Sequence, residues 1–432
     1  MDDYIHPWDE RYHALVAKNL MSDVSEPTLY KYPLLNHENI DWRYCHIWLH
    51  KQPLPLWSIS ASLYVFGLDD FFVRLPSLLL STLSLLITFL IGKNLFNDKV
   101  GLLACFFQAI NGFIIEITSG RIATDHVDIF YMFFIQLAIW FIIKFYKSRN
   151  SLFIVLTGVS IGLAVLCKWL PALMVIPMFM LLGKNVLEKK VIFKYVISII
   201  SCCVLVCLPW QLFIAFYYPT QSAMEQVNNF LHLTSVLDGQ TGSVFYYLNK
   251  IRINYHDLVY VPLIWIIYKC IKHKNKEKLF LLFWIVVPII FFSISKTKMQ
   301  GYILFIAPAL FIIISAFLYF FYKLQHIKLY IKKVVLLLFI LLPVIYCIDR
   351  VFVKNYDSSR IAILNLKKNK IVLNQNKTVI FNCNNYIEAM YYYNCVAYDF
   401  MPSLQQIKQL KDKKYKLYYF ENRRYDKLTK IN

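Results

Sequence analysis

The sequence predicts an all-α, polytopic membrane protein with about ten transmembrane helices, juxtamembrane helices and a small C-terminal α/β domain. Of its 432 residues, 58% are hydrophobic and only 17% are charged, whereas soluble proteins carry about 45–50% apolar and about 25% charged residues. Apolar stretches long enough to cross a bilayer recur between residues 73 and 349. Lysine-rich loops separate alternate stretches, which is typical of a multi-pass membrane protein.

The first predicted domain, residues 1–72, precedes the apolar series and is rich in charge. Its polar residues gather in HPWDERYHALVAKNLM (6–21) and HIWLHKQPLPLW (46–57). Charged side chains lose hydration at a membrane surface, so such a cluster is typical of a functional site. The run 54–68 would form a helix about 22 Å long, short of the roughly 30 Å hydrocarbon core. It therefore predicts a helix lying in the membrane plane.

The second predicted domain, residues 73–349, is the transmembrane part of the chain. Its apolar segments approach the length of about 20 residues that a spanning helix needs. They are 73–92, 100–117, 127–145, 195–217, 279–295, 301–322 and 333–349, with 256–271 as a weaker candidate. The block 151–183 splits at Lys168 into two short spans, joined by the turn Lys168-Trp169-Leu170-Pro171. These segments make up the predicted set of ten.

The cations between the segments predict the orientation in the membrane. If residues 1–72 lie outside, the inner loops include the lysine-rich stretches 184–194 and 269–278. The outer loops then carry far fewer cations, as the positive-inside rule requires. This topology accounts for the formal charge of +20 without nucleic acid as a partner. It also places the unusual polar motifs on the outer side, in contact with membrane lipids.

Residues 350–432 are the third predicted domain, a small extracytoplasmic α/β unit. TVIFN, VAYDF and KLYYF predict short strands, because their aromatic and β-branched residues favour extended backbone. YIEAMYY and SLQQIKQLKDKK between them predict helices.

Three carboxylates are the candidate catalytic groups. Asp9 and Glu10 lie at the start of a predicted helix, where a carboxylate in a partly dehydrated cleft can take a proton from an acceptor. An acid pair at that position also stabilises the helix dipole, so both interpretations stay open. Asp125, at the outer end of the third span, is either the second acid of a site or a helix cap.

Cations on the predicted outer side are the candidate ligands of a phosphate-bearing donor, because lysine and arginine neutralise phosphate oxygens. The candidates are Arg11, Lys51, Lys168, Lys296 and Lys298. Each could instead flank a membrane segment and extend its charge to the interface. His50 and His232, together with an acid, are candidate ligands of a divalent metal ion. There is no P-loop or Gly-rich dinucleotide motif, so the sequence predicts no nucleotide cofactor.

The ordered motifs resemble those of lipid-dependent glycosyltransferases with the GT-C membrane fold. The similarity is greatest to glycosyltransferase family 39, related to the dolichyl-phosphate-mannose protein mannosyltransferases, and to the bacterial aminoarabinose transferase-like enzymes. The motifs are DERYHALVAKNLM, HKQPLPLW, FGLDDFFVRLPS, GRIATDHVDIF, VLCKWLPALMVIP, CLPWQLF and SISKTKMQGYIL, within about residues 6–310. Members of the family have a membrane helix ahead of the first motif, where eight residues precede Asp9 here. A late start codon, a truncated product or a genuine loss of that helix would each explain the difference.

The resemblance implies roles for individual residues. Asp9 matches the acid of the first outer loop that is associated with catalysis, Glu10 is its neighbour, and Asp125 matches the acid of the following outer loop. Lys51 matches a Lys-Pro motif with one residue inserted, and Lys168 lies in a turn similar to Thr-Lys-Gly. Two further lysines fall in a loop similar to Lys-Gly-Lys: Lys296 and Lys298. Where related enzymes have Glu before the Lys-Pro lysine, this chain has His50.

The resemblance implies transfer of a sugar from a polyprenyl-phosphate carrier to an extracytoplasmic acceptor, with inversion. Lipid A, another envelope glycan and a protein are all open as the acceptor. The implied location is a bacterial inner membrane, with the active site on the extracytoplasmic face. A flippase or transporter of lipid-linked sugars is the alternative, but a transporter should carry repeats and broken helices near the bilayer midplane. An inactive assembly subunit is the second alternative.

Overall fold

The computed structural model divides into two compact units. The mixed unit comprises Met1–Pro76, Gly120–Asp125 and Lys354–Asn432, and the helical unit comprises Ser77–Ser119 and His126–Val353. The residues that the structure describes are 1–35, 41–122, 126–184, 186–273, 275–352, 359–368, 377–422, 425 and 427–431. Asp125, a predicted acid, lies outside the described residues.

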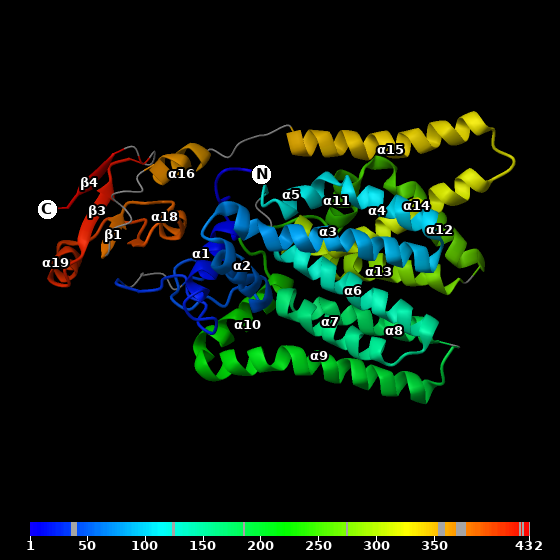
Figure 1. The fold of residues 1–432 in the computed structure, drawn as a ribbon, viewed down its shortest axis with the longest axis horizontal. Helices are drawn as coiled ribbons and strands as arrows, with labels where there is room; N and C mark the ends of the chain where they lie inside the picture. Colours follow the sequence, from blue (N-terminus) through cyan, green and yellow to red (C-terminus); the bar gives the residue numbers. More distant parts are fainter. Residues whose placement is uncertain are drawn as a thin grey trace. The chain divides into compact units, whose positions relative to one another are not determined.

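The helical unit is a bundle of long helices (Figure 1). Helix α3 (Asp70–Leu95) begins in the mixed unit, and from Ser77 onward it belongs to the helical unit. The other helices are α4 (Asp98–Ala109), α5 (Gly112–Thr118), α6 (Val127–Ser148), α7 (Leu152–Lys168), η1 (Leu170–Met174), α8 (Val175–Gly183), α9 (Lys189–Tyr217), α10 (Pro219–Thr234), α11 (Tyr246–Tyr255), η2 (Asp257–Val259), α12 (Tyr260–His273), α13 (Lys276–Ile294), η3 (Gln300–Ile306), α14 (Ala307–Lys323) and α15 (Leu329–Phe352).

The described helices confirm that the chain is an integral, multi-pass membrane protein. Six are long and apolar enough to cross a membrane, or seven if the bent pair α4 and α5 is one span. In the span Gln300–Lys323, 89% of the apolar window is buried, whereas in α9 and in α15 only 11% is buried. Apolar helices left so bare in water would be strongly unfavourable, so their outer faces are suited to lipid.

Each predicted membrane segment is helical, but several helices are shorter or more broken than predicted. The segment 100–117 is two helices at 58°, because the Asn111 side chain accepts a hydrogen bond from the Ile114 backbone and starts α5 afresh. The split at Lys168 is confirmed, since α7 ends there and α8 has only nine residues. The predicted number of ten spans therefore stays a prediction.

Small residues allow α7 to approach α9 closely. A Cβ atom on Gly158 would lie 2.6 Å from the Cys202 Cβ, and one on Gly162 would lie 2.7 Å from the Val206 Cβ. This spacing of four residues places both glycines on one helix face, as in the small-xxx-small pattern of membrane helix pairs. Helix α7 packs between α6 and α9 along its length (Figure 1).

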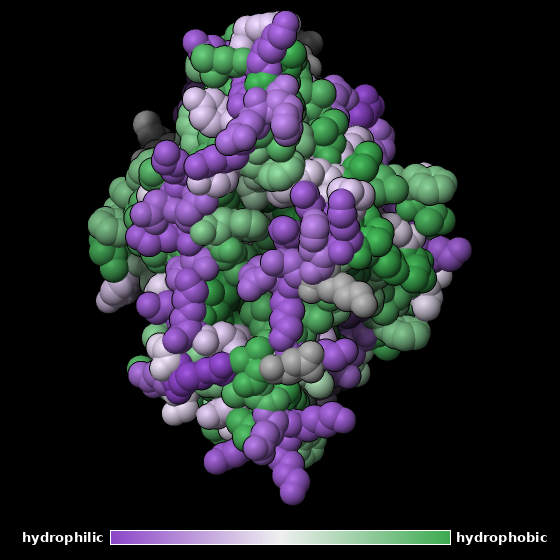
Figure 2. Space-filling view, turned by 90° about the vertical axis from the view of Figure 1, so that its right-hand side faces the viewer, coloured by the Kyte–Doolittle hydropathy of each residue, from purple (hydrophilic) through white to green (hydrophobic). Residues whose placement is uncertain are grey.

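Hydrophilic side chains gather on the face of the helical unit shown in Figure 2. This face carries the loops that join α3 to α4, α6 to α7, α8 to α9, α12 to α13 and α14 to α15 (Figure 1). These are the loops that the sequence predicts to be cytoplasmic. Their exposed cations include Lys93, Lys147, Lys189, Lys272 and Lys328. The concentration of lysine at one end of the bundle agrees with the predicted alternation of loops.

The mixed unit combines helices from the start of the chain with a small sheet from its end. Its described elements, besides the start of α3, are α1 (Asp9–Leu20), α2 (Pro53–Phe66), α16 (Ser359–Lys368), β1 (Thr378–Phe381), α18 (Tyr386–Tyr392), β2 (Cys395–Ala397), α19 (Leu404–Asp412), β3 (Lys416–Phe420) and β4 (Leu428–Lys430). The strand order is β2-β1-β3-β4, with β1 parallel to both neighbours and β4 antiparallel to β3. The three predicted strands and two predicted helices are confirmed, and β4 is additional.

One hydrophobic core joins the two ends of the chain within this unit. It contains Leu15 and Val16 of α1 together with Val379, Phe381 and Ile387 of the C-terminal region. Strand β1 is buried along its whole length, so it packs on both faces. The division into domains at 1–72, 73–349 and 350–432 stays a prediction. The contacts place the first and last of these segments largely in one compact unit.

Lys18 connects α1 to the C-terminal end of α18 by hydrogen bonds. Its ammonium donates hydrogen bonds to three carbonyl oxygens, those of Met390 at 2.7 Å, Tyr391 at 2.8 Å and Tyr393 at 2.9 Å. These carbonyls have no partners inside the helix, so a cation stabilises them. The C-terminal region is thus tied to α1 by polar bonds as well as by apolar packing.

We expect Lys18→Met to destabilise the mixed unit by about 1–3 kcal/mol, because three buried carbonyls lose their donor. A thermal unfolding scan of the purified protein in detergent should show a lower midpoint. Lys31→Met is a matched control, since Lys31 is exposed, donates a hydrogen bond to the exposed Ser22 hydroxyl and lies over the Tyr32 ring, 5.8 Å from its centroid. Equal midpoints for the two variants would contradict the prediction.

Candidate active site

The predicted site residues fall into two groups, one in each unit. Asp9, Glu10, Arg11, His50 and Lys51 lie in the mixed unit. The helical unit holds the others that are described: Lys168, His232, Lys296 and Lys298. Each group has its own geometry.

Asp9 is the first residue of α1, and its carboxylate is partly open to solvent. The Lys51 ammonium lies 3.3 Å from its Oδ1 atom, and the two side chains retain 14% and 21% exposure for Asp9 and Lys51. The position at a helix start fixes the direction of the carboxylate and is favourable for its negative charge. Both interpretations of Asp9 hold in this geometry, because it begins the helix and stays accessible.

Glu10, the next residue, is fully engaged inside the unit. Its side chain is 2% exposed and binds the buried Arg74 guanidinium, with Nε donating to Oε1 at 2.7 Å and Nη2 donating to Oε2 at 3.0 Å. The His6 backbone N–H also donates to Oε2, at 2.7 Å. Arg74 donates further bonds to the carbonyls of Asp2 and Tyr4. This arrangement gives Glu10 a structural role.

Arg11 is directed at the C-terminal region. Its Nη1 atom lies 3.4 Å from Oε1 of Glu388 on α18, whose side chain is fully buried. Burial alone would lower the pKa of Arg11, but the Glu388 carboxylate outweighs it and raises the pKa above its ordinary value. The guanidinium therefore has a protein carboxylate where the sequence predicts a donor phosphate.

The two candidate metal-binding histidines have other neighbours. Within the described part of the chain, no three His, Cys, Asp or Glu side chains come together as a metal site requires. The His50 ring stacks on Trp42, with ring centroids 4.3 Å apart and planes at 6°. The His232 Nδ1 atom lies 3.3 Å from the Tyr302 hydroxyl. These contacts are those of aromatic packing and hydrogen bonding.

Lys168 is the centre of a polar cluster in the helical unit. It is the last residue of α7, and its ammonium forms an ion pair with Oδ1 of Asp128 on α6. It also lies over the Tyr302 ring, 4.8 Å from the ring centroid. Asp128 is 4% exposed as a side chain and Lys168 is 22% exposed. The ammonium therefore keeps one open side.

Lys296 and Lys298 lie on the short segment between α13 and η3, and the structure separates their roles. The segment pairs with the last turn of α10 and the chain after it, since the Lys296 N–H donates to the Leu233 carbonyl and the Lys298 N–H to the Gln240 carbonyl, both at 3.1 Å. Lys296 is exposed. Lys298 is buried, and its ammonium binds the Ser293 and Ser295 carbonyls. Burial, with a smaller effect from Lys296, lowers the pKa of Lys298.

Two tryptophans beside candidate residues have unusual backbone conformations. Trp8, directly before Asp9, has a φ of 74°, and Trp169, directly after Lys168, has a φ of 70°. A bulky residue in this region is strained by about 1–3 kcal/mol, and such strain concentrates at functional sites. The sequence gives no signal for it, because glycine is the residue expected at such positions.

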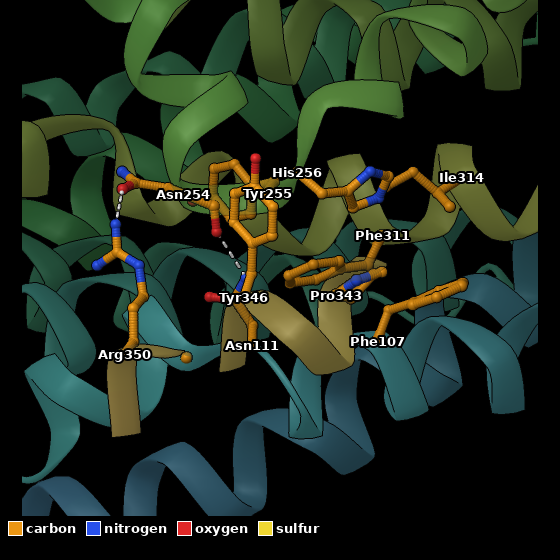
Figure 3. A pocket seen from close by; sticks show the side chains of 11 residues that line it. Phe107, Asn111, Asn254, Tyr255, His256, Phe311, Ile314, Pro343, Tyr346 and Arg350 are labelled. Carbon is orange, nitrogen blue, oxygen red and sulfur yellow. Dashed lines mark hydrogen bonds between the residues drawn. The ribbon is translucent and has the colours of Figure 1, made fainter. Parts of the chain in front are cut away.

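A separate pocket lies in the helical unit, away from every predicted residue (Figure 3). It is a small pocket between the α4–α5 break and α15, lined among others by Asn111, Asn254 and Arg350. Arg350 binds Oε2 of Glu116 at 2.7 Å and Oδ1 of Asn254 at 2.9 Å beside it. This network is not among the predicted sites, although an ionisable pair in apolar helices is a sequence signal that indicates one.

The comparisons with known proteins confirm the resemblance to GT-C glycosyltransferases. Residues 50–212 match the family described as dolichyl-phosphate-mannose-protein mannosyltransferase. The chain is 24% identical over 259 residues to an undecaprenyl phosphate-alpha-4-amino-4-deoxy-L-arabinose arabinosyl transferase of Pseudomonas fluorescens, covering 57% of this chain and 46% of that protein. A similar transferase of Pseudomonas aeruginosa is 25% identical, covering 61% and 49%. The chain thus spans about half the length of the curated relatives it matches.

Solved structures show the same fold. ArnT from Cupriavidus metallidurans in the apo state superposes with a TM-score of 0.67 at 14% identity, covering 98% of this chain and 89% of that one. ArnT bound to undecaprenyl phosphate gives 0.61 at 16% identity, covering 90% and 64%. AglB from Archaeoglobus fulgidus, in complex with an inhibitory peptide and a dolichol-phosphate, gives 0.59 at 12% identity, covering 96% and 67%. The fold and the apolar helices define a multi-pass membrane protein with the GT-C fold.

Proposed function

We propose that this protein is an integral membrane glycosyltransferase that moves a sugar from a polyprenyl-phosphate carrier to an extracytoplasmic acceptor. The observation that carries the proposal is the fold shared with ArnT, solved with undecaprenyl phosphate, and with AglB, solved with a dolichol-phosphate. The acceptor is lipid A, another envelope glycan or a protein. Among the described residues, the break between α4 and α5 is a feature that a flippase would share, and no described feature is specific to an inactive subunit.

Asp9 is the group to which we assign proton transfer. The acceptor attacks the anomeric carbon, the bond from that carbon to the phosphate oxygen breaks, and the acceptor proton passes to the carboxylate. Attack opposite the leaving group inverts the anomeric centre. Asp9 suits this role because its carboxylate is accessible beside Lys51, whereas Glu10 is buried against Arg74. Asp125 is the proposed second acid, on the resemblance alone.

Lys168 and Lys296 are the cations that we assign to the lipid phosphate. The bond that breaks leaves its electron pair on the phosphate, and nearby ammonium groups stabilise the charge that develops there. Both side chains are at least partly open. Lys51 remains a candidate beside Asp9. Arg11 and Lys298 are weaker candidates, since Glu388 and backbone carbonyls already bind them.

The proposed topology has ten spans and places the polyprenyl-phosphate chemistry on the extracytoplasmic side of a bacterial inner membrane. The hydrophilic face of the bundle (Figure 2), whose loops carry the exposed lysines, supports a cytoplasmic position for those loops. A scan of single cysteines with a membrane-impermeant thiol reagent in intact cells tests it. Labelling of an exposed cysteine placed at Lys328, but none at Trp8, would overturn the orientation.

The deciding experiment is sugar transfer by the purified full chain in detergent, supplied with radiolabelled polyprenyl-phosphate sugars and an envelope extract. Covalent label in the extract is the expected result. A flippase would instead move the lipid across proteoliposomes without covalent transfer. No transfer with any sugar, from protein that still binds polyprenyl phosphate, would overturn the enzymatic proposal.

We expect Lys168→Met to raise the KM for the lipid donor by about tenfold to a hundredfold, because one charge-assisted contact to the phosphate is lost. Initial rates at varied donor concentration measure it. Lys269→Met is the matched control, since Lys269 also lies over an aromatic ring, that of Phe320 at 4.4 Å, but on a predicted cytoplasmic helix end. An unchanged KM in Lys168→Met would contradict the assignment.

A further inference from the structure

Asp128 is a buried carboxylate that the proposed reaction does not use. It lies in the first turn of α6 and forms an ion pair with the Lys168 ammonium, whose side chain is 22% exposed. A helix start favours a carboxylate and a helix end favours a lysine, so α6 and α7 each stabilise their member of the pair. The Asp128–Lys168 ion pair affects how an anion binds to Lys168.

The surroundings of Asp128 leave the carboxylate little freedom. A Cβ atom added to Gly301 would lie 2.1 Å from its Oδ2 atom, so the carboxylate occupies the space that any other residue at position 301 would need. The Tyr302 ring lies on the Lys168 ammonium from another side. Glycine at position 301 therefore leaves the space in which the Asp128 carboxylate can lie against Lys168.

A phosphate that binds Lys168 meets this carboxylate as a competitor. Two like charges about 5 Å apart repel by several kcal/mol at an effective dielectric constant of about 20, a magnitude that is large on the scale of binding. The effect differs between substrate and product. The donor is a phosphodiester with one negative charge, whereas the released polyprenyl phosphate is a monoester with about −1.5 to −2 charges at neutral pH.

We propose that Asp128 is an internal counter-ion of Lys168 that exchanges with the lipid phosphate and weakens binding of the product in particular. The inference rests on the proposed function, because it presumes a polyprenyl phosphate at Lys168. Asp128 acts through Lys168 and is a positioning residue. Its benefit to the enzyme is product release, since a monoester held by lysines alone would leave slowly.

The test is binding of undecaprenyl phosphate to the purified full chain in detergent, for the wild type, D128N, K168M and the double variant. D128N should bind about tenfold more tightly, because the competing charge is gone while a hydrogen-bond acceptor remains. In the K168M background, D128N should change the affinity less than twofold. Unchanged or weaker binding by D128N overturns the inference, as does tightening that persists without Lys168.

A second variant avoids dependence on the folding of D128N. G301A retains the carboxylate but pushes it from its place beside Lys168, so binding should tighten by a smaller factor than in D128N. E116Q is the control, because Glu116 is also a partly buried carboxylate in an ion pair, with Arg350, and its removal should leave the affinity unchanged. Failure of the wild type to bind undecaprenyl phosphate overturns the proposed function together with this inference. If D128N does not fold, wild-type binding that G301A does not tighten overturns the inference alone.

Discussion

Replacement of Asp9 by asparagine is expected to lower the rate of sugar transfer by about a hundredfold to ten-thousandfold, the usual contribution of a general base. Asparagine keeps the shape of the side chain and an oxygen that can accept hydrogen bonds, but it cannot take a proton. The Asp9 side chain is partly exposed, so the fold should tolerate the change. The measurement is kcat in the transfer assay with a saturating lipid donor.

The control for this prediction is Asp3→Asn in the same segment. Asp3 is an exposed acid whose described ion pair, 3.5 Å to Arg360, is a surface contact. Its replacement should leave the transfer rate and the unfolding midpoint unchanged. An Asp9→Asn protein that is folded and transfers sugar at the wild-type rate would remove Asp9 from the chemistry. The role of Asp9 would then be only to stabilise the start of helix α1.

Replacement of Arg74 by methionine should destabilise the mixed unit by about 3–5 kcal/mol, the largest stability effect expected for this chain. The change leaves the Glu10 carboxylate buried without its guanidinium, and it removes the donors to the Asp2 and Tyr4 carbonyls. A buried charge without a partner costs far more than the pair contributes. Thermal unfolding in detergent, followed by intrinsic tryptophan fluorescence, measures the loss.

The double variant Arg74→Met with Glu10→Met separates this mechanism from a loss of packing. With both charges gone, no carboxylate stays buried alone, so the double variant should recover much of the lost stability. Lys93→Met is the surface control, because the Lys93–Asp98 pair, 3.1 Å apart, is exposed at both ends. A double variant less stable than Arg74→Met would contradict this explanation.

Most of the membrane helices could be predicted from the sequence, because long apolar runs leave few alternatives to a helix in lipid. Two helices of the helical unit were missed, α10 and α11, whose polar residues interrupt any apolar run. Their helical character depends on amphipathic spacing, which a search for spans does not detect. Strand β4 was missed since three residues are too short to show a period.

The residues of the candidate site could be predicted from the sequence, but the side chains with which they form ion pairs could not. The motif contains two adjacent acids, Asp9 and Glu10, and the sequence does not distinguish which of them is the catalytic base. What distinguishes them is Arg74, 64 residues away, which binds Glu10 and leaves Asp9 accessible. Arg11 likewise depends on Glu388, 377 residues away. Pairings over such distances depend on tertiary packing, on which local sequence patterns carry no information.

The Arg11–Glu388 contact also bears on how the protein matures in the cell. The ribosome makes Glu388 377 residues after Arg11, so the segment around Arg11 waits through the synthesis of nearly every membrane helix. Until then its apolar residues and its guanidinium lack their lasting neighbours. A chain interrupted after its helices have inserted would expose that segment to proteases, and only finished molecules would present an ordered Asp9.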